Sequence, residues 1–155
     1  MALESKNWGA QVAKLHVRPD EGTEYRFGPN RLLLKIGAEA GANLANMFVS
    51  SFPPGGGNPL LHVHNSYEEM FYVLEGEIEY RLGQESVRAG VGGSVFVPPG
   101  TPHKFENVGS GQAVHVVVVS PAAAMRMIEE QAKAGPNRAA QAAILERYDS
   151  RLLDE

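Results

Sequence analysis

The feature that most constrains the fold of this chain is a run of short strand-like segments, separated by turn residues, between positions 44 and 120. The segments lie at 44–52, 61–64, 69–74, 77–82, 86–89, 94–97, 104–107 and 113–119. Glycine, proline or asparagine separates nearly all of them, and the chain holds 17 glycines and 10 prolines. Because no helical segment intervenes, the pattern predicts an antiparallel sandwich or barrel and argues against parallel βαβ units.

The N-terminal arm, residues 1–43, is mixed and polar. It contains two strand candidates, 24–27 and 31–36, next to the turn clusters 18–22 and 28–30. We see no boundary to a further domain here, so we expect the arm to lead directly into the central sheet.

After the last strand the pattern changes to that of a helix. Ser120 is expected to be an N-cap, with Pro121 at the first helical position. The helix then covers 122–134 and stops at Gly135.

A second helix is expected after Pro136. Its apolar stripe consists of Ala140, Ile144, Tyr148 and Leu152, which recur every four residues. We therefore predict a single domain over residues 1–155, with a barrel at 44–120 and two short helices at 121–155.

Charge and composition exclude several classes of function. Acidic residues outnumber basic ones, 18 to 14, and the net charge of −4 argues against nucleic-acid binding. The chain has no cysteine, so disulfides, thiolate metal sites and cysteine nucleophiles are excluded. No apolar run approaches the ~20 residues that span a bilayer, and residues 1–10 do not resemble a signal peptide. We expect a soluble cytoplasmic protein that binds a small molecule and has neither a membrane nor a nucleic acid as partner.

Three histidines and one glutamate point to a metal site. His62 and His64 are two apart in one strand candidate, so both imidazoles face the same side. Glu69 begins the next strand, and His103 follows a rigid turn that contains three prolines. Nitrogen and oxygen donors of this kind suit a borderline divalent metal, and the lack of a sulfur ligand argues against structural zinc.

These four residues stand in two motifs with regular spacing. The first reads glycine, five residues, His-x-His, four residues, glutamate, six residues, glycine; the second reads glycine, five residues, Pro-x-Gly, two residues, histidine, three residues, asparagine. The motif residues are Gly56, His62, His64, Glu69 and Gly76, then Gly92, Pro98, Gly100, His103 and Asn107. The pair resembles the two motifs of the cupin superfamily, and the chain is similar to small single-domain cupins.

The resemblance implies an all-β fold, a double-stranded β-helix or jelly-roll barrel, here with an N-terminal strand arm and two C-terminal helices. It also implies the ligand set His62, His64, Glu69 and His103 for a divalent ion of Fe, Mn, Ni, Co, Cu or Zn. The ligand set does not select among these metals.

A looser resemblance concerns activity. The segments 25–30, 71–76 and 95–98, together with the proline–glycine run before the first motif, are similar to bacterial quercetinase-like cupins. This implies a dioxygenase acting on an aromatic or enolisable small molecule, with Glu69 as metal ligand and general base. Two alternatives stay open: a non-catalytic ligand-binding or sensory barrel, and a metal-dependent lyase, isomerase or cyclase.

Strand parity suggests which side chains surround the metal. Phe48, Ser50 and Phe52 share one face of their strand, Phe71 shares the face of Glu69, and Phe105 shares that of His103. These five are expected to line an aromatic substrate pocket, with plain core packing as the alternative for each one. The face of His115 is not determined by the pattern.

Finally, we predict a homodimer. The arm carries more apolar residues than a solvated segment requires, namely Leu15, Val17, Leu32, Leu33, Leu34 and Ile36. The stripe of the second helix adds another face to be covered, and two-fold pairing is the commonest closed assembly. The continuously apolar run 116–119 fits a strand buried on both faces or one packed against a partner. The alternative is that arm and helices fold back on their own barrel.

Overall fold

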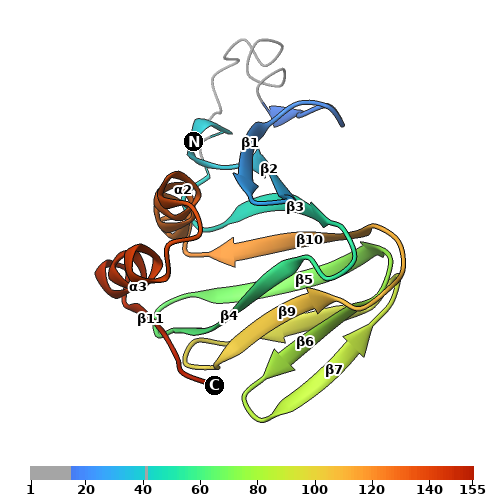
Figure 1. Cartoon of the computed structure of the whole chain (residues 1–155). Helices are drawn as coiled ribbons and strands as arrows, with labels where there is room; N and C mark the ends of the chain where they lie inside the picture. Colours follow the sequence, from blue (N-terminus) through green and yellow to red (C-terminus); the bar gives the residue numbers. More distant parts are fainter. Residues whose placement is uncertain (1–14, 41) are drawn as a thin grey trace.

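The structure is a computed structural model that describes residues 15–40 and 42–155. Two antiparallel sheets face each other (Figure 1). The six-stranded sheet has the order β1 (Thr23–Phe27), β2 (Asn30–Ile36), β3 (Asn46–Phe52), β10 (Ala113–Ser120), β5 (Glu68–Glu75) and β8 (Ser94–Val97). The five-stranded sheet has the order β11 (Ser150–Leu152), β4 (Gly57–His64), β9 (His103–Asn107), β6 (Ile78–Leu82) and β7 (Glu85–Ala89). A short 3-10 helix, η1 (Ala38–Ala40), precedes β3.

The connectivity between the sheets is that of a double-stranded β-helix. From β3 to β10 the chain crosses repeatedly from one sheet to the other, and only β6 and β7 follow each other within a sheet. The all-β, jelly-roll fold expected from the sequence is therefore confirmed.

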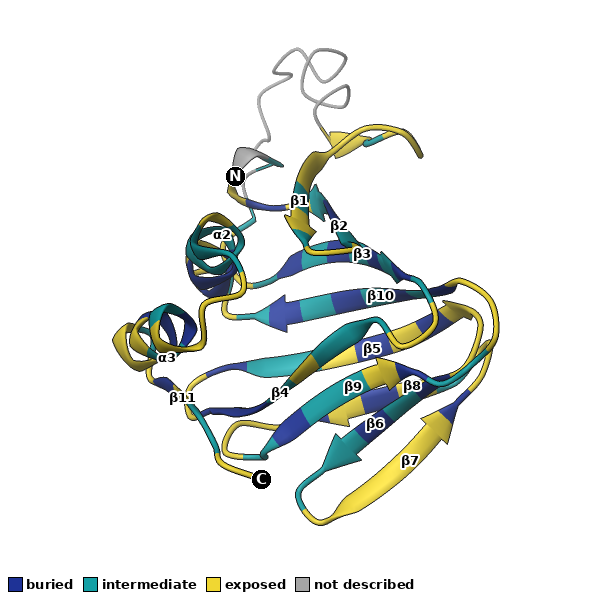
Figure 2. Ribbon diagram, viewed as in Figure 1, coloured by how far each residue is buried: buried dark blue, intermediate teal, exposed yellow. Residues whose placement is uncertain are grey.

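Alternation along the strands places the core between the sheets. In β3 and β10 every second residue is buried and the residues between are partly exposed (Figure 2). The most deeply buried large side chains include Phe52, Val73, Ile78, Tyr80 and Val117. Burying each such side chain contributes roughly 1.5–3 kcal/mol to folding, so this inward row holds the two sheets together.

One strand begins earlier than the sequence suggests. The sequence predicts a strand at 61–64, yet β4 begins at Gly57. The side chain of Asn30 accounts for this, since it donates to the Gly57 carbonyl at 2.7 Å and accepts from the Gly57 amide at 3.2 Å. Gly57 has φ of 134°, and a Cβ there would lie 2.5 Å from the carbonyl oxygen of Phe105, so only glycine fits this close approach.

The first helix, α2, covers Ala124–Ala134: it ends at Gly135 as expected but begins two residues after the expected start at residue 122. The expected N-cap is wrong. Ala123 holds that position without a side-chain hydrogen bond, while the Ser120 hydroxyl donates to the Leu44 carbonyl at 2.9 Å. Ser120 is the last residue of β10, so its hydroxyl is committed to the sheet end and not to the helix.

The second helix, α3, covers Arg138–Arg147 and is capped by Asn137, whose side chain accepts from the amide of Ala140. The expected stripe ends before Leu152, which lies in β11. The chain turns at Asp149, where φ is 51°, and then pairs with β4. Neither helix in the described part of the chain is long and apolar enough to span a membrane.

The described part of the arm and the two C-terminal helices pack on their own barrel. Strand β2 pairs with β3, and α2 and α3 bury Met125, Met127, Ile128, Ile144 and Leu145 in the main hydrophobic cluster. Residues 1–14 of the predicted arm lie outside the described residues. The fold-back arrangement thus accounts for the described arm and the helices, so these features no longer argue for a dimer.

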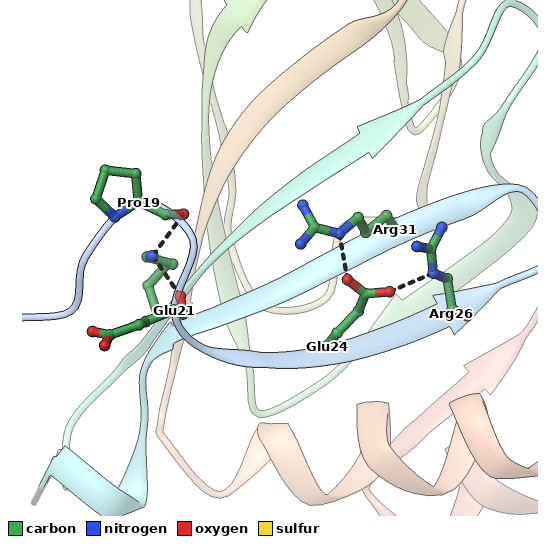
Figure 3. Close-up of polar contacts among 6 residues, drawn as sticks. Pro19, Glu21, Glu24, Arg26 and Arg31 are labelled. Atoms are coloured by element: carbon green, nitrogen blue, oxygen red, sulfur yellow. Dashed lines mark hydrogen bonds and ion pairs between the residues drawn. The ribbon is translucent and has the colours of Figure 1, made fainter.

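Ion pairs fasten the first hairpin, and hydrogen bonds from Lys35 fasten the segment before it (Figure 3). The Glu24 carboxylate accepts from Arg31 at 2.5 Å and from Arg26 at 2.6 Å, and these hydrogen bonds lower the pKa of Glu24. The Lys35 ammonium donates to the carbonyl of Glu21 at 2.6 Å and to that of Pro19 at 3.3 Å. The outer face of this hairpin is therefore charged and solvated.

Candidate metal centre

The four residues of the predicted ligand set meet between the two sheets. Strand β4 carries His62 and His64, β9 carries His103, and Glu69 comes from β5 on the opposite sheet. Their ligand atoms all lie within 4.8 Å of one another. His62 stands directly opposite His103 in the β4–β9 pairing, with ring centroids 4.2 Å apart. The group thus lies inside the barrel, where both sheets contribute.

The outer nitrogen of each imidazole is hydrogen-bonded away from the cluster. Nδ1 of His62 lies 2.7 Å from the Leu60 carbonyl, and Nδ1 of His103 lies 2.9 Å from the Thr101 carbonyl. A carbonyl can only accept, so each Nδ1 carries a proton. Each Nε2 is therefore left to face the cluster, which is the arrangement that a metal-binding imidazole requires.

His64 is oriented by the C-terminal strand. Its Nδ1 lies 2.8 Å from the hydroxyl of Ser150 in β11, and that hydroxyl donates its own proton to the Tyr148 carbonyl at 3.0 Å. Because the hydroxyl proton is already used, Nδ1 of His64 is the donor. All three histidines consequently have the same tautomer preference.

Burial and mutual repulsion keep two of the imidazoles neutral. Burial, with the nearby His103 and His64, lowers the pKa of His62 to about 3. Burial also lowers the pKa of His64. Neutral imidazoles have the lone pair that a metal ligand needs.

His103 and Glu69 form a charged pair inside the barrel. Nε2 of His103 donates to Oε2 of Glu69 at 2.8 Å. Burial opposes the charge on His103, but the hydrogen bond and charge of Glu69 outweigh it and raise the pKa of His103. Burial likewise opposes ionisation of Glu69, yet the hydrogen bond and charge of His103 lower its pKa to about 2. A bound cation would replace the proton that His103 shares with Glu69.

The residues present fit a divalent metal. Three inward nitrogens and one carboxylate oxygen form the mixed donor set of Fe, Mn, Ni, Co, Cu and Zn sites. A single carboxylate neutralises one of the two charges of such an ion, so the centre favours an anionic ligand at any remaining position. The set His62, His64, Glu69 and His103 can therefore hold the cofactor implied by the sequence.

A cavity of about 510 Å³ opens onto this cluster. His62, His64 and Glu69 are on its wall, and α2 and α3 contribute Met127, Gln131 and Leu145 to the other side. The five side chains that parity assigned to a pocket, Phe48, Ser50, Phe52, Phe71 and Phe105, all line it. The cavity is thus largely apolar with a polar end at the cluster.

His115 faces the barrel interior and is fully buried. Its Nδ1 lies 2.9 Å from the Tyr80 hydroxyl, and its Nε2 has no hydrogen-bond partner among the described residues. The rings of Phe52, Phe71 and Phe105 surround it at centroid distances of 5.0–5.2 Å. Burial lowers the pKa of His115 to about 3 and raises that of Tyr80.

Sequence reasoning missed Ser150, which is hydrogen-bonded to His64, and Tyr80, which is hydrogen-bonded to His115. Tyr80 has the inward parity of Ile78 in β6 and could have been found from that alternation. Ser150 is 86 residues from His64 along the chain, so no local pattern signals their contact.

Fold and site together define a class, a jelly-roll barrel with a three-histidine, one-glutamate centre. The sequence model of the family described as "Cupin domain" matches residues 48–120. This match covers just under half of the chain, and together with the fold it supports placing the chain among the small cupins.

Three similar proteins show how far the likeness extends. An uncharacterized protein of Methanocaldococcus jannaschii is 42% identical over 57 residues, which are 37% of this chain and 46% of that protein. This chain thus spans just under half the length of that relative. The structure of a predicted oxalate decarboxylase of Thermotoga maritima superposes with a TM-score of 0.63 at 25% identity, over 68% of this chain and 98% of that chain. A polyketide cyclase of Streptomyces resistomycificus gives a TM-score of 0.60 at 23% identity, over 68% and 74% of the chains, and this likeness concerns the fold.

Proposed function

We propose that this cupin is a metal-dependent dioxygenase that acts on an aromatic or enolisable small molecule. The observation that carries the proposal is the position of the Glu69 carboxylate, between the imidazoles of the candidate centre and an aromatic cavity of about 510 Å³. A carboxylate there can take a proton from a substrate hydroxyl, and the aromatic walls can hold a flat ring beside it.

Glu69 is the residue assigned to proton transfer. It is ionised at neutral pH because the hydrogen bond and charge of His103 lower its pKa to about 2, against the effect of burial. When the substrate enters as a neutral hydroxyl compound, Glu69 accepts the hydroxyl proton and leaves the substrate as an anion. A divalent metal held by the four residues supplies Lewis-acid and template chemistry for the substrate and dioxygen.

The pocket walls orient the ring and exclude water. The ring of Phe105 is tilted against those of Phe71 and Phe52, with centroids 5.6 and 5.7 Å away, and against that of Tyr80 at 5.9 Å. The cavity volume lies in the range of about 300–1,000 Å³ that takes drug-sized ligands. A two-carbon dicarboxylate such as oxalate, the substrate in the name of the Thermotoga maritima protein, would leave most of this apolar space unfilled.

A second candidate is a metal-dependent cyclase or isomerase that uses no oxygen. It is favoured by the fold likeness to a polyketide cyclase and by the same aromatic cavity. It needs the same metal ligands and the same base, but no second reactant. A barrel that only binds or senses the small molecule is the third outcome.

Measurements of oxygen consumption and substrate turnover distinguish the three candidate functions. The purified protein is loaded with each of Fe, Mn, Ni, Co and Cu, and quercetin, a flavonol, is added with and without air while dissolved oxygen and quercetin absorbance are followed. The dioxygenase consumes oxygen with quercetin in equal amounts and is silent without air. Turnover of an enolisable polyketide-like substrate without air identifies the cyclase or isomerase class. Saturable binding with no turnover under either condition identifies the sensory barrel.

The matched control for these assays is His16→Ala, because His16 is exposed and belongs neither to the cluster nor to the lining of the cavity. Loss of activity in His64→Ala with full activity in His16→Ala ties turnover to the centre. Equal activity in both variants contradicts the proposal.

A further inference from the structure

The cavity wall that the helices supply contains a buried glutamine. Gln141 lies in the first half of α3 and is only 6% exposed, yet it lines the cavity of about 510 Å³. Met127, Ile128 and Leu145 on the same side of the cavity are apolar. A carboxamide in such a wall is costly to bury unless its polar atoms find partners. The partners of its nitrogen and its oxygen therefore indicate its role.

The nitrogen of this side chain is fully used within the protein. Nε2 of Gln141 donates to the carbonyl of Gln131 at 2.9 Å and to that of Gly135 at 2.6 Å, at the C-terminal end of α2. A carboxamide nitrogen carries two protons and a carbonyl can only accept, so both protons are committed. These two hydrogen bonds fix the amide and leave its oxygen, Oε1, as the free end.

The oxygen of Gln141 has no partner among the described residues. The hydrogen bonds of this side chain are the two from Nε2. In the part of the chain that the structure describes, Nε2 of His115 is the one fully buried side-chain polar atom without a partner. Oε1 of Gln141 therefore keeps accessible surface, and the surface that this residue shows lies on the cavity. The cavity thus has a fixed hydrogen-bond acceptor on a helix that contributes none of the four candidate ligands.

Ser50 on β3 provides a contrast within the same cavity. Its side chain is 9% exposed, it lines the cavity, and its hydroxyl has no partner within residues 15–40 and 42–155. A hydroxyl rotates and can both donate and accept, so Ser50 does not select one kind of ligand group. Oε1 of Gln141 can only accept, and it cannot turn without breaking two hydrogen bonds. The acceptor on α3 therefore selects a donor.

We propose that Gln141 binds the substrate by accepting a hydrogen bond from a hydroxyl or amine group at the end of the molecule that faces α3. The inference rests on the proposed function, which places an aromatic small molecule in the cavity with an enolic hydroxyl at Glu69. It narrows that substrate class to flat molecules with a second donor besides this hydroxyl. An analogue without the second donor displaces water from Oε1 and leaves the acceptor unpaired, which lowers affinity.

Two probes that differ in the second donor test the proposal. The parent compound flavonol carries only the hydroxyl next to the ketone, whereas quercetin also carries hydroxyls on both outer rings. Binding is measured by calorimetry without air, once with Zn²⁺ and once with the metal-free protein, so that the measurement needs no turnover. The wild type should bind quercetin about tenfold more tightly than flavonol, because flavonol leaves Oε1 unpaired. Equal affinities, or no binding of either compound, overturn the proposal.

A matched pair of variants ties the preference to Gln141. Gln141→Met keeps the length of the side chain and removes the amide, and Gln84→Met makes the same change in an exposed turn outside the cavity lining. The tenfold preference should disappear in Gln141→Met and persist in Gln84→Met. If the amide only held α3 to the end of α2, its loss would weaken both compounds equally. An unchanged ratio of affinities in Gln141→Met therefore overturns the proposal.

A crystal structure of the wild type with quercetin gives the same decision if Gln141→Met does not fold. An outer-ring hydroxyl is expected within about 3.0 Å of Oε1 of Gln141. A bound ring that leaves this oxygen without a ligand donor overturns the proposal.

The oxygen assay of the proposed function is independent of these measurements. A protein that shows the quercetin preference and consumes no oxygen keeps the Gln141 site and loses the dioxygenase. A protein that consumes oxygen with both compounds and binds them equally keeps the dioxygenase and loses the Gln141 site.

Discussion

The two sheets of this barrel hold the candidate centre in different ways. The five-stranded sheet contributes three imidazoles, and each is fixed from behind by an acceptor outside the cluster. The six-stranded sheet contributes the Glu69 carboxylate, whose hydrogen bond in the cluster comes from His103, itself one of the imidazoles. One sheet therefore supplies a preorganised set of donors, and the other supplies a carboxylate that depends on that set.

The difference indicates a division of roles. Imidazoles whose rotation and tautomer are fixed in advance can bind a metal without further ordering, because hydrogen bonds behind the ligands already orient them. A carboxylate that exchanges one partner for another is suited to moving a proton. The comparison predicts that changes in the five-stranded sheet affect metal binding and that a change at Glu69 affects turnover.

The largest effect is expected for Glu69→Gln. The amide keeps the shape and an oxygen donor but cannot accept a proton, so turnover should fall by roughly 10²–10⁴. Metal content, measured by elemental analysis of the same samples, should fall much less. The control is Glu68→Gln, the neighbouring residue on the outward face of β5. Unchanged turnover in Glu69→Gln would remove the base role and the division of roles with it.

His103→Ala should weaken metal binding by about a hundredfold or more. Loss of a residue that merely orients a ligand already costs about 10–100-fold in affinity, and His103 is itself a candidate ligand. Titration of the metal-free protein with Co²⁺, followed by visible absorption, measures this, with His16→Ala as the matched loss of an exposed histidine. Circular dichroism should show an intact barrel, since the inward rows of Val73 and Val117 do not involve His103. Full occupancy in His103→Ala contradicts the ligand assignment.

A smaller effect, about tenfold in Co²⁺ affinity, is expected for Ser150→Ala. The substitution removes the acceptor that fixes Nδ1 of His64 but leaves every candidate ligand in place. Ser150→Thr keeps a hydroxyl and should restore most of the affinity. Arg151→Ala, at the adjacent exposed position in β11, is the control for general damage to the strand. Equal losses in Ser150→Ala and Arg151→Ala would show that β11 acts only through strand pairing.

The smallest expected effect concerns acid stability. Burial holds the pKa of His62 and of His115 at about 3, below the ordinary value of 6.5. The unfolded chain therefore binds more protons as the pH falls from 6.5 towards 3, and the free energy of unfolding of the metal-free protein falls over this window. Glu69 acts in the same direction at lower pH, because its stabilising contribution is lost as the pH falls from 4.5 towards 2. The contribution of His103 has the opposite sign, since its raised pKa stabilises the fold below 6.5 and is lost as the pH rises through that pKa.

Substitution of His115 isolates one part of this pH dependence. We expect denaturant unfolding of the metal-free His115→Gln variant between pH 6.5 and 3 to show a smaller slope of unfolding free energy against pH than the wild type. The difference should correspond to at most about one proton. Tyr80→Phe removes the hydrogen bond to His115 without removing a group that titrates in this range, because burial raises the pKa of Tyr80. An unchanged slope in His115→Gln would show that His115 is not the neutral buried group described above.

Local patterns predicted much of this molecule. Alternation and turn residues placed the strands, because side-chain burial and backbone geometry act over a few neighbours. The spacing of two motifs singled out His62, His64, Glu69 and His103, which the fold brings within 4.8 Å. Their role as metal ligands and the role of the five pocket residues remain proposals.

The failures have a common physical cause. The helical stripe was extended to Leu152, the N-cap was assigned to Ser120, and β11 was not foreseen. Each depends on a distant partner: β4 for Leu152, the Leu44 carbonyl for Ser120, and His64 for Ser150. Tertiary contacts override local preference where a strand edge or a buried polar atom offers a better partner.

The hydrogen bond between His64 and Ser150 can form only late in the synthesis of the chain. Ser150 is 86 residues downstream of His64 and lies beyond residues 48–120, the part that matches the family. A ribosome that has completed both histidine motifs has not yet made the acceptor that orients His64. With the proposed residues as metal ligands, the nascent barrel would have its donors before their full alignment, and full affinity for the metal would require β11 to have closed on β4.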